Sequence, residues 1–132
     1  MKKDQTCPCG RPEKYTECCA KPHQNITNAK TAEDLMRSRY VAFTMAIGDY
    51  LMESHHSQTK PLELLPNLVL WAKSVKWLKL EIVKVTDGGE EDAEGIVEFK
   101  AHYIENSKKQ IMHQRGKFMR EYGHWVYFDV IP

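Results

Sequence analysis

The sequence predicts an α+β fold, in which a small cysteine-rich module precedes three helices packed on a curved antiparallel sheet of at least four strands. Apolar residues recur at helical spacing between residues 31 and 71, and from residue 75 onward they alternate with polar residues at the period of strands. All four cysteines lie within the first 19 of the 132 residues. A chain of this length allows one ordinary domain and one small satellite module.

The first helix is expected to begin after Thr31, because a threonine side chain can cap a helix and Asp34 follows three residues later. Its apolar stripe comprises Met36, Tyr40, Phe43 and Ile47. This spacing predicts a helix with one face turned toward the sheet.

Two shorter helices are expected to follow. Gly48 is suited to end the first helix, and Asp49 is suited to cap a second one over residues 50–55. A third helical segment is expected after Pro61, although Pro66 interrupts its pattern. The apolar residues of this segment are Leu62, Leu65, Leu68 and Trp71.

The second half of the chain is expected to form an antiparallel meander. Strands are predicted over residues 77–85, 94–105, 110–121 and 124–131, with turns at residues 87–89, 106–107 and 123. One face of the second strand is apolar and carries Val97, Phe99, Ala101 and Tyr103. The helices are therefore expected to cover one face of the sheet.

Charge and hydropathy exclude several function classes. The 19 basic and 18 acidic residues leave a formal net charge of +1, which provides no long-range field to attract nucleic acid or an anionic membrane. No apolar run has the length of a signal peptide core or a membrane span. We therefore expect a soluble, cytoplasmic protein with no membrane partner and with nucleic acid as an unfavoured one.

The four cysteines are spaced as a metal site. Cys7 and Cys9 are separated by one residue, and Cys18 and Cys19 are adjacent. A disulfide between adjacent cysteines is strained, and cytosolic thiols stay reduced. Four thiolates complete the tetrahedral shell of one structural Zn²⁺ without an open position. His23 is expected to be solvent-exposed rather than a ligand.

The segment CPCGRPEKYTECC resembles the SEC-C motif, a zinc-binding module that also occurs at the C-terminus of the SecA translocase. The resemblance implies a knuckle over residues 1–24, with Cys7, Cys9, Cys18 and Cys19 as its zinc ligands. In SecA the module resembles a docking element for a chaperone and the ribosome. This copy is less basic, because Arg11, Pro12, Glu13 and Thr16 replace the usual residues.

Five further segments, in order, resemble motifs of the YchJ-like bacterial proteins: TAEDLMRSRYVAF, DYLMESHHSQTKP, GIVEFKAHY, MHQRGKF and HWVYFD. This resemblance covers nearly the whole chain. It implies that residues 25–132 form a cone-shaped α+β domain similar to SnoaL, nuclear transport factor 2 and the cystatin-like folds, behind a SEC-C knuckle.

Such cones include enzymes as well as binding proteins, so the fold does not decide the activity. The polar residues that could serve a pocket are Arg37, Tyr40, His56, Thr59, Lys60, His113 and Arg115. His113 and Arg115 share one face of their strand, which is either the concave face or the solvent-exposed one. The sequence contains no catalytic serine triad pattern, glycine-rich phosphate loop or spare cysteine nucleophile.

The expected function is therefore that of a zinc-binding protein-interaction or adaptor module, built from a SEC-C knuckle on a cone and acting on a protein partner. One alternative is a small-molecule-binding protein or acid–base enzyme that uses the cone cavity. A weaker alternative is association with the ribosome or nucleic acid through the knuckle. No catalytic residue is assigned, and binding is favoured over catalysis.

Overall fold

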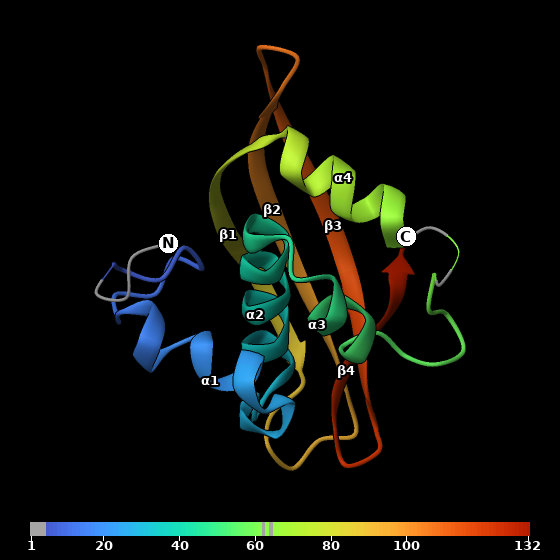
Figure 1. Cartoon of the computed structure of the whole chain (residues 1–132). Coiled ribbons are helices and arrows are strands. Elements are labelled where there is room, and N and C mark those ends of the chain that lie inside the picture. The colour runs from blue at the N-terminus through green and yellow to red at the C-terminus, as the bar shows by residue number, and fades with distance from the viewer. Residues whose placement is uncertain (1–4, 62, 64) are drawn as a thin grey trace.

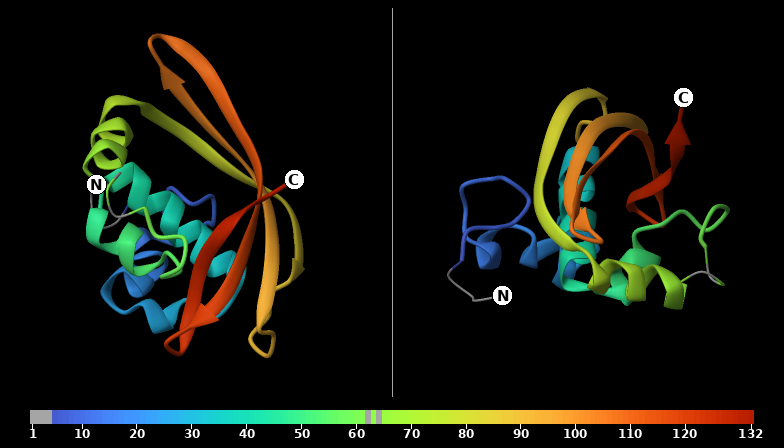
Figure 2. Two further views of the ribbon diagram at one scale, coloured as in Figure 1. Left: turned by 90° about the vertical axis from the view of Figure 1, so that its right-hand side faces the viewer. Right: turned by 90° about the horizontal axis from the view of Figure 1, so that it is seen from above.

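Four antiparallel strands form one curved sheet in the order β1-β2-β3-β4 in the computed structural model, which describes residues 5–61, 63 and 65–132. The strands are β1 (Lys76–Asp87), β2 (Glu94–Glu105), β3 (Lys108–Glu121) and β4 (His124–Ile131). The helices of the described chain lie on one face of this sheet, and the other face is uncovered (Figures 1 and 2). The predicted α+β fold is confirmed.

Two tight turns determine how the strands are paired. Asn106 and Ser107 both have positive φ, 53° and 65°, as do Tyr122 and Gly123, 55° and 84°. Two residues with positive φ form the type I′ turn, whose twist matches that of the flanking strands. Because the first turn has only two residues, Lys108 pairs directly with Glu105, and β3 begins two residues earlier than predicted.

The long helix α2 (Ala32–Met45) begins as predicted and ends differently. The hydroxyl oxygen of Thr31 accepts a hydrogen bond from the Asp34 backbone N–H at 3.0 Å. At the other end Ala46 is left-handed, with φ 54°, and the Ile47 N–H donates to the Ala42 carbonyl at 2.9 Å. The backbone thus closes α2 without a glycine, and the packing of Ile47 against the core accompanies this end.

Gly48 therefore does not end α2; it is the first residue of α3 (Gly48–Glu53), and the expectation that Asp49 caps this helix was also wrong. Helix α4 (Leu65–Ser74) follows, and the predicted Leu62 lies outside the described residues. Pro66 does not interrupt α4, because it occupies the first turn, where a backbone N–H has no acceptor within the helix.

The N-terminal segment adds a fourth α-helix to the three predicted. It contains two short 3-10 helices, η1 (Tyr15–Glu17) and η2 (Ile26–Asn28), and the helix α1 (Ala20–Gln24) between them. Residues 5–24, called the knuckle below, lie beside α2 and away from β4 (Figures 1 and 2). Within the described chain, no helix combines the length and apolarity needed to cross a bilayer.

The core lies between α2 and the concave face of the sheet. Val97, Phe99 and Ala101 of β2 are buried, as the strand pattern predicted, and Tyr103 is half-buried. Among the described residues, the largest fully buried side chain is that of Trp125 in β4, whose indole N–H donates to the Lys30 carbonyl at 3.1 Å. This bond joins the end of the sheet to the segment that leads into α2.

The turn between β1 and β2 packs on the start of α2. The Ala32 N–H donates to the Gly88 carbonyl at 2.9 Å. Gly88 has φ 77°, and a Cβ atom added to it would lie 2.7 Å from the Ala32 Cβ. Strand β1 itself has two register irregularities, between Trp77 and Lys79 and between Ile82 and Lys84.

Candidate metal centre

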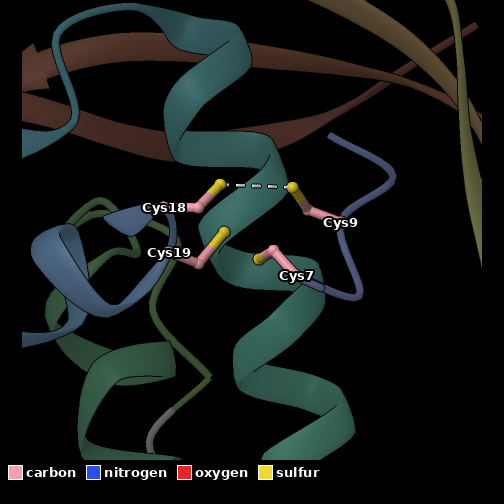
Figure 3. A group of neighbouring side chains, drawn as sticks. All are labelled: Cys7, Cys9, Cys18 and Cys19. Atoms are coloured by element: carbon pink, nitrogen blue, oxygen red, sulfur yellow. Dashed lines mark hydrogen bonds between the residues drawn. The ribbon is translucent and has the colours of Figure 1, made fainter. Parts of the chain in front are cut away.

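Four cysteine thiols converge in the knuckle. Figure 3 shows them arriving from two segments: Cys7 and Cys9 from the first loop, Cys18 and Cys19 from the junction of η1 and α1. Their Sγ atoms all lie within 4.8 Å of one another, and the four thiols are free. Cys7, Cys9 and Cys19 are buried and Cys18 is half-buried. The predicted ligand set is therefore brought together in space.

The spacing of the sulfur atoms fits a metal ion rather than disulfides. A tetrahedral ion with metal–sulfur bonds of about 2.3 Å separates its sulfur ligands by about 3.8 Å. The Cys9 and Cys18 sulfur atoms lie 3.6 Å apart, well beyond the disulfide bond length of about 2.05 Å. The four residues can hold one cation with thiolate ligands.

The protonation of each of the four thiols depends on the others and on whether a cation is present. Hydrogen bonds from Cys19 and Cys7 lower the pKa of Cys9 to about 2, so its thiolate is stabilised by its neighbours. Burial, followed by the charge on Cys9, raises the pKa of Cys18 to about 12, and the pKa of Cys19 is raised by its hydrogen bonds to Cys7 and Cys9. Without a cation, ionisation of one thiol disfavours ionisation of its neighbours. A divalent ion compensates the negative charge of several thiolates.

The first ligand loop is a short hairpin. Thr6 and Lys14 form an antiparallel bridge, and the Cys7 N–H donates to the Glu13 carbonyl at 2.9 Å. Gly10 has φ 99°, a conformation that glycine adopts at little cost, and it lies against α2 and β1. This turn returns the chain so that Cys7 and Cys9 face the second pair.

Two arginines attach this hairpin to α2. The Arg37 Nη1 donates to the Cys9 carbonyl at 2.6 Å, and its Nε donates to Glu33 at 2.9 Å. Arg11 reaches in the opposite direction and forms an ion pair with Asp34 at 2.8 Å. Arg37 was predicted to serve a pocket of the cone; its contacts place it beside Cys9, one of the four clustered cysteines.

The second ligand pair is attached through His23. Its Nε2 lies 2.8 Å from the Ser38 carbonyl and therefore donates, so its Nδ1 accepts from the Tyr15 hydroxyl at 2.8 Å. The ring also packs edge-on against Tyr50, with centroids 4.7 Å apart. The expected exposure of His23 was wrong, because these contacts half-bury it and burial lowers its pKa. It is not a member of the metal cluster.

A groove of about 310 Å³ runs along the junction of the knuckle and the segment from η2 into α2. Its charged residues are Arg11, Glu13, Glu17, Lys21 and Asp34, and Cys18, Cys19, Pro22 and Asn28 complete its walls. Arg11 is neutralised by its ion pair with Asp34. The groove borders two of the four clustered cysteines, so its charge depends on whether their thiols are protonated, ionised or bound to a cation.

The other residues predicted for a pocket lie in three different surroundings. Tyr40 is buried in the concave face, where it lines a cavity of about 130 Å³, and burial raises its pKa to about 12. The segment that follows α3 instead pairs with the outer edge of β4. There the His56 N–H donates to the Tyr127 carbonyl at 2.8 Å, and the Thr59 hydroxyl donates to the Phe128 carbonyl at 2.6 Å. Lys60 follows in the same segment.

His113 and Arg115 lie on the uncovered face of the sheet. His113 contacts Glu98 at 2.6 Å, and Arg115 donates to the Pro132 carbonyl at 2.7 Å. Their strand neighbour Gln114 points the other way and lines the cavity with Tyr40. The described structure therefore does not bring His113 and Arg115 to a common site with His56 or Tyr40, because the register of β3 turns them to the opposite face.

Sequence reasoning missed the charged residue that lines the cavity, Arg39. It is 6% exposed, and its Nη1 donates to the Leu51 carbonyl at 3.0 Å and the Ser54 hydroxyl at 2.8 Å. Burial lowers the pKa of Arg39 to about 10, which leaves it charged at neutral pH. Helical spacing could have found it, because Arg39 follows Met36 by three residues on the apolar stripe of α2.

Comparison with known proteins decides the family. Residues 31–130 match the model of the YchJ middle domain, which is described as NTF2-like. The chain belongs to the YchJ-like family. A UPF0225 protein from Streptomyces coelicolor is 41% identical over 93% of this chain and 92% of its own length. A UPF0225 protein from Vibrio parahaemolyticus is 37% identical over 94% of this chain and 73% of its own length.

Two solved structures extend the similarity to the knuckle of this YchJ-like chain. A SEC-C motif containing protein from Rhodopseudomonas palustris has a TM-score of 0.85 at 26% identity, over 96% of this chain and 98% of its own. A second, from Psychrobacter arcticus, has a TM-score of 0.81 at 29% identity, over 96% of this chain and 82% of its own. Both matches cover nearly the whole chain, so these two proteins share its arrangement of knuckle and α+β domain.

Proposed function

We propose that the cysteine cluster holds one structural Zn²⁺, and that the zinc-loaded knuckle and the start of α2 together form a docking surface for a protein partner. Four thiolates leave a tetrahedral zinc ion no open position for substrate, which favours a structural role over a catalytic one. Buried sulfur ligands are typical of zinc and of iron–sulfur centres. The hydrogen bonds and ion pairs to α2 support a knuckle held in a fixed orientation.

The surplus of negative charge in the groove at the knuckle carries the proposal about the partner. With Arg11 neutralised by Asp34, the remaining charged side chains of the groove are Glu13, Glu17 and Lys21. A Zn²⁺ ion with four thiolates adds a formal charge of about −2 at the groove wall. This potential attracts a positively charged peptide segment and repels phosphate. It therefore weighs against the ribosome or nucleic acid alternative.

The metal is tested on protein purified without added zinc. Native mass spectrometry and elemental analysis are expected to find one zinc per chain. The Cys18→Ser, Cys19→Ser double variant is expected to lose it, because half of the ligand shell is gone. Stoichiometric iron, or no stoichiometric metal in the intact protein, would reject the zinc assignment.

The docking surface is tested by titrating the zinc-loaded protein with a lysine- and arginine-rich peptide and following backbone amide NMR signals. The Glu13→Gln, Glu17→Gln variant is expected to bind about tenfold more weakly, because two charge contacts are lost. The matched control is Glu90→Gln, Glu91→Gln, which removes two exposed carboxylates from the turn between β1 and β2. Equal weakening in both variants would mean that the peptide senses only overall charge, and the groove would be rejected.

An acid–base enzyme is less well supported. Such an enzyme needs a titratable group beside a hydrogen-bond donor in one pocket, whereas Tyr40, His56 and His113 have separate surroundings. The small-molecule alternative is favoured by a different observation, the buried Arg39 in the cavity.

A further inference from the structure

The buried guanidinium of Arg39 lacks a carboxylate partner. No ion pair joins it to an acidic side chain of the described residues, and its partners are two neutral acceptors, the Leu51 carbonyl and the Ser54 hydroxyl. Two aromatic rings flank the guanidinium carbon, Tyr127 at 4.9 Å and Phe43 at 5.9 Å. Removing a charge from water without a counter-ion is costly, and aromatic faces compensate only part of that cost.

The guanidinium of Arg39 has nitrogen atoms that the described fold does not use, and the residue borders a cavity. Both structural hydrogen bonds of Arg39 come from Nη1. Nε and Nη2 make no hydrogen bond to the residues that the structure describes. Arg39 is also one of the residues that line the cavity. Two parallel donors thus remain for something inside it.

The cavity has the size and walls for one planar ring. Its volume is about 130 Å³, close to the cavity of about 150 Å³ that binds benzene in an engineered protein core. Tyr40, Phe43, Trp71 and Trp77 supply aromatic walls from α2, α4 and β1. The rings of Trp71 and Trp77 meet edge to face, with centroids 5.4 Å apart.

We propose that this cavity binds a small planar carboxylate of about the size of benzoate, with its carboxylate paired to Nε and Nη2 of Arg39 and its ring between the aromatic walls. The guanidinium fork matches a carboxylate with two parallel hydrogen bonds. The side chain of Gln114 lines the same cavity and adds one amide donor. The anion supplies the counter-charge that the fold does not. This site is distinct from the knuckle groove and does not depend on the peptide proposal.

A purely structural Arg39 is the competing explanation. Its Nη1 joins α2 to the end of α3, and that contact alone would hold the two helices together. A structural role predicts no discrimination between a charged and a neutral molecule of the same shape. Anion binding predicts strong discrimination, because a neutral molecule leaves the buried charge uncompensated.

The three tryptophans allow a test in the intact, metal-loaded protein. Trp71 and Trp77 line the cavity, whereas Trp125 is fully buried elsewhere and serves as an internal control. Benzoate is titrated while the three indole N–H signals are followed by NMR, and benzamide, its neutral isostere, is titrated in parallel. We expect saturable shifts of Trp71 and Trp77 with benzoate, an unmoved Trp125 signal, and at least about tenfold weaker binding of benzamide.

Substitution of Arg39 completes the test. Arg39→Met keeps an unbranched side chain without the charge and is expected to abolish the preference for benzoate over benzamide. Arg115→Met, on the uncovered face of the sheet, is the matched control and is expected to leave this preference unchanged. Equal binding of benzoate and benzamide to the unmodified protein would overturn the proposal, as would the absence of saturable shifts at Trp71 and Trp77. These outcomes decide it even where Arg39→Met does not fold, and they leave the peptide titration at the knuckle unaffected.

Discussion

The contact between Arg37 and Cys9 predicts that a residue of α2 controls the affinity of the knuckle for its metal. The Arg37 side chain is 15% exposed, and it donates to the Cys9 carbonyl at 2.6 Å and to Glu33 at 2.9 Å. A largely buried hydrogen bond from a charged group contributes about 1.5–3 kcal/mol, and a helical ion pair at this spacing about 0.3–0.5 kcal/mol. Arg37→Met removes both and leaves the carbonyl of a ligand residue without its donor.

We therefore expect Arg37→Met to destabilise the metal-loaded knuckle by about 2 kcal/mol, which corresponds to about thirtyfold weaker metal binding. Competition against a chromophoric zinc chelator measures this affinity. Arg115→Met is the matched control, because Arg115 also donates to a backbone carbonyl but is exposed. A metal affinity of Arg37→Met within about twofold of the unmodified protein, together with unchanged thermal unfolding, would refute the idea that α2 supports the metal site.

Three further predictions follow from burial, linkage and backbone conformation. Chelation is expected to lower the unfolding temperature, and free zinc at about 100 times its Kd is expected to stabilise the protein by about 2.7 kcal/mol, which calorimetry at several zinc concentrations measures. Burial, and then the charge of Arg39, lowers the pKa of His55 to about 4. The folded protein therefore resists protonation of His55, whereas the unfolded chain takes up the proton near pH 6.5. The free energy of unfolding is expected to decrease as the pH falls from 6.5 toward 4. With allowance for the partial exposure of His55, this loss of unfolding free energy is about 1 kcal/mol at pH 5. Urea unfolding of His55→Gln is expected to show a flatter pH dependence between pH 4 and 6.5. Gly88→Ala is expected to cost about 2 kcal/mol or more, since it adds a methyl group 2.7 Å from Ala32 at a positive φ; an unchanged urea midpoint would contradict the packing of this turn on α2.

The convergence of the four cysteines was predictable because their geometry is local. The four cysteines lie within 13 residues, so their spacing alone restricts the loops that can join them. The strand faces were predictable for a related reason, since the period of two assigns Val97 and Phe99 to one side whatever the neighbouring strands do. The start of α2 followed from the side chain of one residue, Thr31.

The pocket residues were less predictable because they depend on which side of an element faces the core. Arg37 and Arg39 are two residues apart, about 200° around the helix, so one contacts the knuckle and the other lines the cavity. On β3 a shift of one position exchanges Gln114 for His113. The end of α2 at Ala46 was missed because its left-handed residue is stabilised by the packing of Ile47, a contact that sequence patterns do not show.

The position of the knuckle has a consequence for the two outer edges of the sheet, β1 and β4. The outer edge of β4 is paired by the segment that follows α3, through bonds between Ser54 or His56 and Tyr127. Among the residues that the structure describes, no such segment pairs with the edge of β1. This edge carries the exposed lysines Lys76, Lys79 and Lys84, and its two register irregularities break a straight row of donors. Gly10 of the knuckle lies against the Leu80 carbonyl. Such features discourage another chain from adding a strand. One of these features, Gly10, belongs to the loop that carries Cys7 and Cys9. If the proposed metal holds this loop, its loss is expected to leave β1 more open to intermolecular pairing and the protein more prone to aggregate.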